Sequence, residues 1–185
     1  VTVARTWAVA LSGLRGDLVE VEADVSSQTP EFSIIGLPDK ALGEAGRRVR
    51  NACTNRGLDL PKRRITVNLS PASLPKRGSG FDVAIAVAAL ATSVDMDAAR
   101  VATTVHVGEL GLDGRLRPVP GVLPSVIAAQ RAGHTRVVVP SANAAEARLV
   151  EGVEVFAAAC LAEVVRWHGG SSDAADLVAV EAPGG

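Results

Sequence analysis

Hydrophobic and polar residues alternate in several stretches of the chain, and this period of two predicts β-strands. The clearest case is DLVEVEADV at 17–25, in which apolar residues alternate with Glu20, Glu22 and Asp24. A similar run at 3–11 precedes it, and Gly13–Gly16 between the two runs indicates a turn. The chain therefore begins with a predicted hairpin. Further strands are predicted at 32–37 and 64–69.

Two later stretches have helical patterns of different kinds. Pro38 and Asp39 are typical of a helix N-terminus, an apolar stripe continues to Cys53, and Gly57 is placed to end the helix. The stretch 81–91 is almost entirely apolar, which predicts a helix buried on every side. The sequence thus predicts one amphipathic helix and one core helix.

The second half of the chain alternates between short strands and short helices. Asp113 and Gly114 separate two alternating segments and predict a hairpin across 104–119, after a helical turn at 95–100. We expect helices at 122–132, 143–149 and 161–167, and strands at 136–139 and 154–157. Strands first, followed by strands and helices in alternation, indicate an α/β (α+β) domain with helices packed on a mixed sheet.

The 185 residues and 48% hydrophobic content fit one domain with a tail. Residues 1–168 are assigned to the domain, and 169–185, which are small, acidic and rich in glycine, to a linker. No apolar run reaches the roughly 18 residues of a membrane helix, and the N-terminus lacks a signal-peptide pattern. Cys53 and Cys160 lie in apolar helical patterns and are expected to be buried free thiols. We therefore expect a cytoplasmic protein without a membrane partner.

The net charge is −1, but the charged residues are unevenly distributed along the chain. Residues 44–77 carry nine positive and two negative side chains, so this segment is +7 and the rest of the chain is −8. A basic zone on an otherwise acidic protein indicates a nucleic-acid surface, and a solvated helix face with turns is the alternative. The candidate nucleic-acid contacts are Arg47, Arg48, Arg50, Lys62, Arg63, Arg64, Lys76 and Arg77.

Motifs for nucleotides and metals are not found. The sequence lacks GxxxxGK[ST], and Gly78-Ser79-Gly80 lacks the third glycine of a dinucleotide fingerprint. The three histidines lie far apart in the sequence without other metal-binding residues nearby, so we interpret them as structural and expect no metal site. Asp82 begins the apolar helix, where a carboxylate can cap backbone N–H groups and complement the helix dipole.

Nucleophilic catalysis has candidate serines but little support. Ser73, Ser79 and Ser125 are the obvious nucleophiles, and a serine needs an adjacent base. All three lysines lie in the first 76 residues, so a lysine base from the C-terminal half is excluded. No nucleophile-elbow motif supports a Ser–His–Asp triad, although residue counts do not exclude one.

Several longer stretches, taken together, resemble a known family. They are ARTWAVALSGL, PEFSIIGLPDKALGEAGRRVRNA, RRITVNLSPASLPKRGSGFDVAIA, GELGLDGRLRPVPGVLP, AAQRAG and VVVPSANAAEA. The chain from residue 4 to about 168 resembles the N-terminal Lon-protease-like domain of the YifB/ComM family of magnesium-chelatase-like AAA+ ATPases. The resemblance implies a Lon-like fold, in the superfamily of the second domain of a small-subunit ribosomal protein. It also implies an AAA+ module beyond the linker, a hexamer, and branch migration of DNA in recombination. ATP and Mg are expected in that module, and no cofactor in this chain.

The resemblance extends to Lon peptidases, whose catalytic residues are a serine and a lysine. Laid over the GPSAG loop of Lon, PKRGSGFD puts Gly80 at the serine position, and PGVLPS puts Ser125 at the lysine position. Ser79 lies one residue away but has no lysine base. We therefore expect a non-catalytic domain that contributes DNA binding or ring assembly. The alternatives are a Lon-type serine peptidase and a pure oligomerisation or partner-docking domain.

Overall fold

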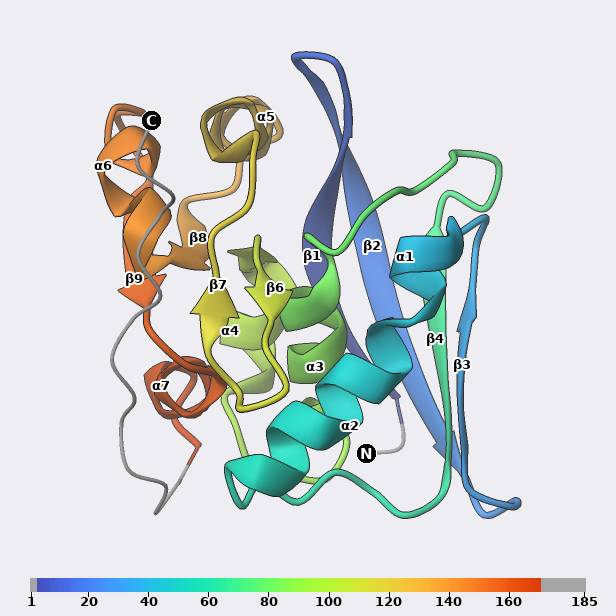
Figure 1. Cartoon of the computed structure of the whole chain (residues 1–185). Helices are drawn as coiled ribbons and strands as arrows, with labels where there is room; N and C mark the ends of the chain where they lie inside the picture. The colour runs from blue at the N-terminus through green and yellow to red at the C-terminus, as the bar shows by residue number, and fades with distance from the viewer. Residues whose placement is uncertain (1–2, 171–185) are drawn as a thin grey trace.

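The computed structural model describes residues 3–170, which form a seven-stranded mixed sheet with packed helices (Figure 1). In the order β3-β4-β2-β1-β5-β8-β9, the sheet consists of β3 (Glu31–Ile35), β4 (Arg64–Ser70), β2 (Arg15–Ser26), β1 (Val3–Ser12), β5 (Val105–His106), β8 (Arg136–Pro140) and β9 (Glu154–Ala158). A separate two-stranded ribbon contains β6 (Glu109–Leu110) and β7 (Leu116–Arg117). The predicted α+β class is confirmed.

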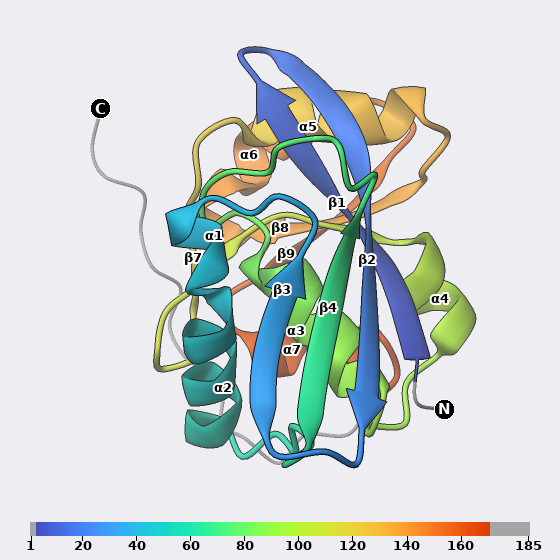
Figure 2. The same cartoon turned by 90° about the vertical axis from the view of Figure 1, so that its right-hand side faces the viewer.

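The helices are α1 (Lys40–Gly43), α2 (Ala45–Asn55), α3 (Asp82–Ala91), α4 (Ala98–Thr103), α5 (Val122–Arg131), α6 (Ala144–Ala147) and α7 (Leu161–Trp167), with a 3-10 turn η1 (Ser141–Asn143). They pack on a sheet with two different halves. β1, β5, β8 and β9 run parallel, whereas β2 is antiparallel to both β1 and β4. Figure 2 looks onto β3, β4 and β2 from the side that the helices leave uncovered. One face of this half therefore meets solvent, as antiparallel sheets tolerate.

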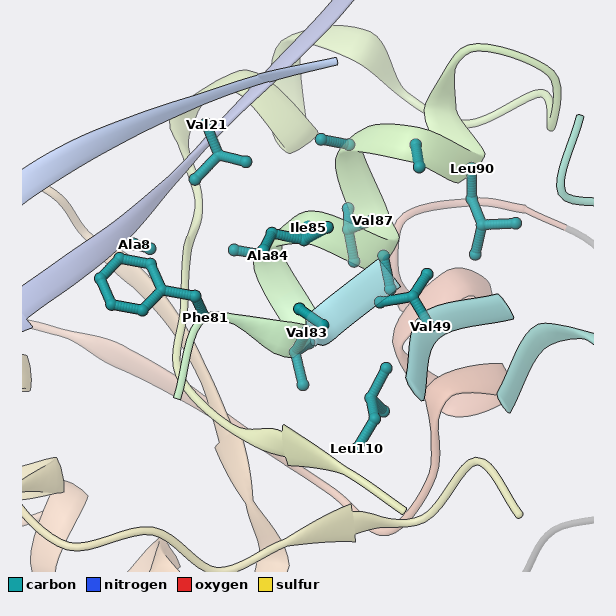
Figure 3. Close-up of a cluster of buried hydrophobic side chains, with 14 of the residues drawn as sticks. Ala8, Val21, Val49, Phe81, Val83, Ala84, Ile85, Val87, Leu90 and Leu110 are labelled. Carbon is teal, nitrogen blue, oxygen red and sulfur yellow. The ribbon is translucent and has the colours of Figure 1, made fainter. Parts of the chain in front are cut away.

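Strand alternation divides the core between the two faces of the sheet. On one face, buried side chains of β1, β2 and β4 pack against α2, α3 and α7. On the other face, side chains of β5 and β8 pack against α5 and α6. The apolar helix α3 is buried from Asp82 to Leu90, between the sheet and α2 (Figure 3). This explains why its sequence has no polar stripe.

The structure interrupts two of the predicted elements. The helix expected from Asp39 to Gly57 breaks at Glu44, where α1 ends and α2 begins. The strand expected at 104–110 breaks at Gly108, whose N–H donates to the carbonyl of Gly80. Val83 in turn donates its N–H to the Gly108 carbonyl, so the backbone here bonds to the start of α3 instead of continuing the sheet.

The expected second hairpin and the expected buried thiols are confirmed. The hairpin at Asp113–Gly114 forms, with β6 and β7 as its strands. Cys53 and Cys160 are buried free thiols, and burial raises the pKa of Cys53 to about 12. Within residues 3–170, no helix has the length and apolar character needed to cross a membrane. Most of the predicted linker, residues 171–185, lies outside the described residues.

Candidate functional site

Helix α2 lies beside β3 (Figure 2), and its outward side carries several side chains that can donate hydrogen bonds. Its apolar residues, including Val49 and Ala52, are fully buried. Gly46 lets the helix approach β3, because a Cβ at this position would lie 2.9 Å from the Phe32 ring. The other side of α2 carries Arg47, Arg50, Asn51 and Thr54, at the i, i+3, i+4 and i+7 positions of one helix face.

Two shallow hollows follow this face and share Arg50. The first, of about 580 Å³, is lined by Phe32, Arg47, Arg48 and Arg50, together with Glu44 and two glycines. The second, of about 250 Å³, is lined by Arg50, Thr54, Lys62 and neighbouring residues that include Asp59. Three of the predicted contacts, Arg47, Arg50 and Lys62, thus lie along one edge, which we call the α2 edge.

Arg48 points inward and binds Asp82 at the start of α3. Its Nε donates to Asp82 Oδ2 at 2.7 Å, and its Nη2 donates to Oδ1 at 2.9 Å and to the Ala41 carbonyl at 2.8 Å. The Arg48 side chain is 18% exposed and that of Asp82 fully buried. Arg48, predicted as a nucleic-acid contact, is therefore mainly a positioning residue that fixes α2 against α3.

Asp82 accepts a further hydrogen bond from the Leu110 N–H at 3.0 Å. Burial raises the pKa of Asp82 to about 6, although the bonds from Arg48 and Leu110 favour its charged form. No side-chain capping bond is made at the start of α3, contrary to the expectation that Asp82 caps the helix. The carboxylate instead joins α2, α3 and β6.

Lys76 is fully buried, which corrects its prediction as a nucleic-acid contact. Its Nζ donates to the carbonyl of Gly36 at 2.7 Å, to that of Leu69 at 3.0 Å and to that of Pro71. An ammonium group has three donor hydrogens, so these three carbonyls use them all. Burial lowers the pKa of Lys76. The ammonium group is therefore held by backbone carbonyls at the ends of β3 and β4.

The remaining predicted cations lie at different ends of the sheet. Arg77 is exposed in the loop before α3, where Asp39 accepts from the N–H of the next residue, Gly78. Arg63 is exposed at the other end, immediately before β4. Arg64 is engaged on the uncovered sheet face, 3.2 Å from Glu31. The basic segment is therefore split, and only part of it belongs to the α2 edge.

The two positions that match the Lon catalytic residues hold no dyad. Gly80 precedes α3, and a Cβ built there meets no atom within 4 Å. Ser125 is buried in α5, where its hydroxyl donates to the Gly121 carbonyl at 2.7 Å. Within residues 3–170, no group of three His, Cys, Asp or Glu side chains is placed to hold a metal.

The structure reveals a buried histidine pair that the sequence did not predict. His106 Nε2 and His168 Nε2 are 2.8 Å apart, and Thr6 Oγ1 lies 3.1 Å from His106 Nδ1. The Thr6 hydroxyl donates its proton to two backbone carbonyls, which can only accept hydrogen bonds. His106 Nδ1 is therefore the donor in its contact with the Thr6 oxygen. Burial lowers the pKa of His168 to about 4. The two histidines are separated by 62 residues, and no local motif connects them.

Comparison with known proteins places the chain among magnesium-chelatase-like proteins. The model of a family described as subunit ChlI of Mg-chelatase matches residues 21–143. The competence protein ComM of Haemophilus influenzae is 40% identical over 169 residues, which are 91% of this chain and 33% of that protein. YifB of Salmonella typhimurium is 40% identical over 149 residues, covering 80% of this chain and 29% of that protein.

More distant similarity extends to Lon. The Lon protease of Mycolicibacterium smegmatis is 30% identical over 144 residues, which are 73% of this chain and 18% of that protein. The chain spans about a third of the length of its ComM and YifB relatives. Since the family model covers well over half of the residues, the chain belongs to the Mg-chelatase ChlI-like family that includes ComM and YifB.

Proposed function

We propose that the chain is a non-catalytic domain of a magnesium-chelatase-like ATPase and that its α2 edge binds the phosphates of DNA. The observation that carries the proposal is the alignment of Arg47, Arg50 and Lys62 along one edge. Each cation can neutralise a phosphate without reading a base, so binding would be independent of sequence.

The dimensions of α2 suit a nucleic-acid backbone. At 1.5 Å per residue its 11 residues span roughly 16 Å, which corresponds to roughly five phosphates at 3.4 Å per nucleotide of one strand. Thr54 and Asn51 add neutral donors on the same side of α2, although the Asn51 amide also donates to the Arg47 carbonyl at 2.9 Å. Glu44 and Asp59 are the acidic residues that line the two hollows, so the local charge stays positive.

In this proposal the chain is not a peptidase, because the two residues aligned with the Lon serine and lysine do not support that chemistry. A Lon-type mechanism needs a serine with a lysine base, but Gly80 has no side chain and Ser125 cannot serve as a base. The buried ammonium of Lys76 is held by three backbone carbonyls. Cleavage of a fluorogenic peptide that disappears in Ser79→Ala would contradict this part of the proposal.

The wider assembly is inferred from the family. We infer that the full-length protein is a cytoplasmic hexameric AAA+ ATPase, with ATP and Mg in a module outside this chain. One relative is a competence protein, and we take DNA branch migration in recombination as the process served. A domain that only assembles the ring or docks a partner is the alternative, and it predicts no DNA affinity for the chain.

Fluorescence anisotropy with a labelled duplex tests the DNA surface. With three phosphate contacts, the slope of log K against log salt should be roughly −2.7. Arg50→Glu should weaken binding and make this slope shallower by about 1 or more. The matched control is Arg148→Glu, which makes the same charge change at an exposed arginine outside the α2 edge. No binding at low salt, or equal losses in both variants, would refute the proposal.

A further inference from the structure

The most exposed large hydrophobic side chain in residues 3–170 is Leu14, which is 87% exposed. It lies at the tip of the β1–β2 hairpin, in a two-residue turn whose first residue is Gly13 with φ +62°. Such turns favour glycine first and a polar residue such as Asn, Asp or Ser second. Neither the turn nor the core therefore accounts for a leucine at this position.

The hairpin that carries Leu14 is long, and helix α5 packs against one side of it. β1 and β2 remain paired up to Ser12 and Arg15, which flank the turn, and the tip projects beyond the neighbouring strands (Figures 1 and 2). α5 packs so closely on it that a Cβ at Gly16 would lie 2.6 Å from Ala128 Cβ. The tip is therefore a supported projection of the sheet.

Cations lie beside this apolar tip. A hollow of about 570 Å³ between the hairpin and α5 is lined by Leu14, Arg15, Asp17, Leu18, Ile127 and Arg131, with other residues of the same segments. The side chain of Arg15 is 79% exposed, with Nη2 3.6 Å from Asp17 Oδ1, and Arg131 is exposed on α5. The tip thus combines an apolar side chain with two arginines and one acid.

We propose that Leu14 is a wedge that inserts beside the last base pair at a fork or branch of DNA. The proposal rests on the DNA binding proposed above. Apolar side chains, leucine among them, enter base steps and unstack them in other proteins. Arg15 and Arg131 would hold the flanking phosphates, as cations do beside such insertions.

The free energies of leucine burial and base unstacking favour insertion at a fork over insertion into an intact duplex. Burying one leucine side chain gains free energy of the same order as unstacking a base step costs. A single leucine therefore does not open an intact duplex. At a fork the terminal pair has already lost one stacking neighbour, so the same insertion becomes favourable there. The wedge should act at junctions and leave duplex interiors closed.

The test uses 2-aminopurine, whose emission rises when it is unstacked, placed at the last pair before a fork or inside a blunt duplex. The wild-type chain should raise the emission at the fork and leave the interior position unchanged. Leu14→Ser should not raise it, and should bind the fork roughly threefold to tenfold more weakly while duplex affinity stays the same. Serine suits the turn, so the hairpin is retained. Leu149→Ser, at a leucine that is 70% exposed elsewhere, should behave as wild type.

The outcomes separate this inference from the DNA proposal. Salt-dependent duplex binding without a rise in emission at the fork, or an equal rise in Leu14→Ser, overturns the wedge alone. A changed sedimentation coefficient in Leu14→Ser with unchanged emission would assign the tip to a protein contact and also overturns it. No binding to any DNA at low salt overturns both.

Discussion

The buried ammonium of Lys76 gives the sharpest test of how the basic segment is divided. We consider Lys76→Met, which keeps an unbranched side chain of similar length and removes the three donors to Gly36, Leu69 and Pro71. A hydrogen bond that involves a charged group contributes about 1.5–3 kcal/mol, and a carbonyl left unsatisfied costs about 1–3 kcal/mol. The substitution also removes the cost of burying the ammonium, which offsets part of this loss.

The expected net destabilisation is about 2–4 kcal/mol, a large part of the roughly 5–15 kcal/mol of a typical domain. It corresponds to a fall in Tm of roughly 4–16 °C, at about 2–4 °C per kcal/mol for a domain of this size. Urea unfolding followed by circular dichroism measures the change. Lys62→Met, at an exposed lysine of the α2 edge, should change the free energy of unfolding by less than about 0.5 kcal/mol.

The same two variants should reverse their order in DNA binding. Measured well below its Tm, Lys76→Met should bind duplex as tightly as wild type, because the Lys76 side chain is buried. Lys62→Met should bind more weakly. If Lys76→Met unfolds like wild type and binds DNA less tightly, Lys76 is a surface contact and the division of the basic segment is wrong.

Two further predictions concern protonation and backbone space. Because the folded-state pKa of His168 is about 4 against 6.5, the unfolded state takes up its proton first, and stability should fall by about 3 kcal/mol as pH drops from 6.5 to 4. The raised pKa of Asp82 acts in the opposite direction. The quantity to compare is therefore the free energy of unfolding against pH in wild type and in His168→Asn, which should give the flatter profile. An unchanged profile contradicts the prediction. Gly36→Ala should cost roughly 3 kcal/mol or more, since φ is +112° and a Cβ would lie 2.2 Å from the Leu69 carbonyl oxygen. Gly80→Ala should change stability by less than about 1 kcal/mol, because the space around it is open; equal costs in thermal melts would refute the comparison.

The sequence predicted the elements that local patterns specify. The first hairpin, the apolar helix α3 and the turn at Asp113–Gly114 follow from alternation, apolar runs and turn residues, all of which act over a few positions. The break at Gly108 was missed because it depends on hydrogen bonds to the start of α3, about 25 residues away. The histidine pair was missed for the same reason.

The candidate site was only partly predictable for a related reason. Charge counting located the basic segment, but it does not say which way a side chain points. Arg47 is exposed and Arg50 half-buried on the outer side of α2, whereas Arg48 between them turns toward a buried carboxylate. Lys76 and Arg77 are adjacent, and one is buried while the other is exposed. Their roles are decided by carbonyls and carboxylates that come from other parts of the chain.

The loop between β4 and α3 has a structural role that its contacts make clear. The Lys76 ammonium binds backbone carbonyls at the ends of β3 and β4. The N–H of Gly78 donates to Asp39, which also caps α1. Asp82, at the end of the loop, holds Arg48 and thereby fixes the orientation of α2. The loop before α3 thus fixes the helix whose outer side carries Arg47 and Arg50. If the α2 edge binds DNA as proposed, its geometry therefore depends on buried residues that lie behind it.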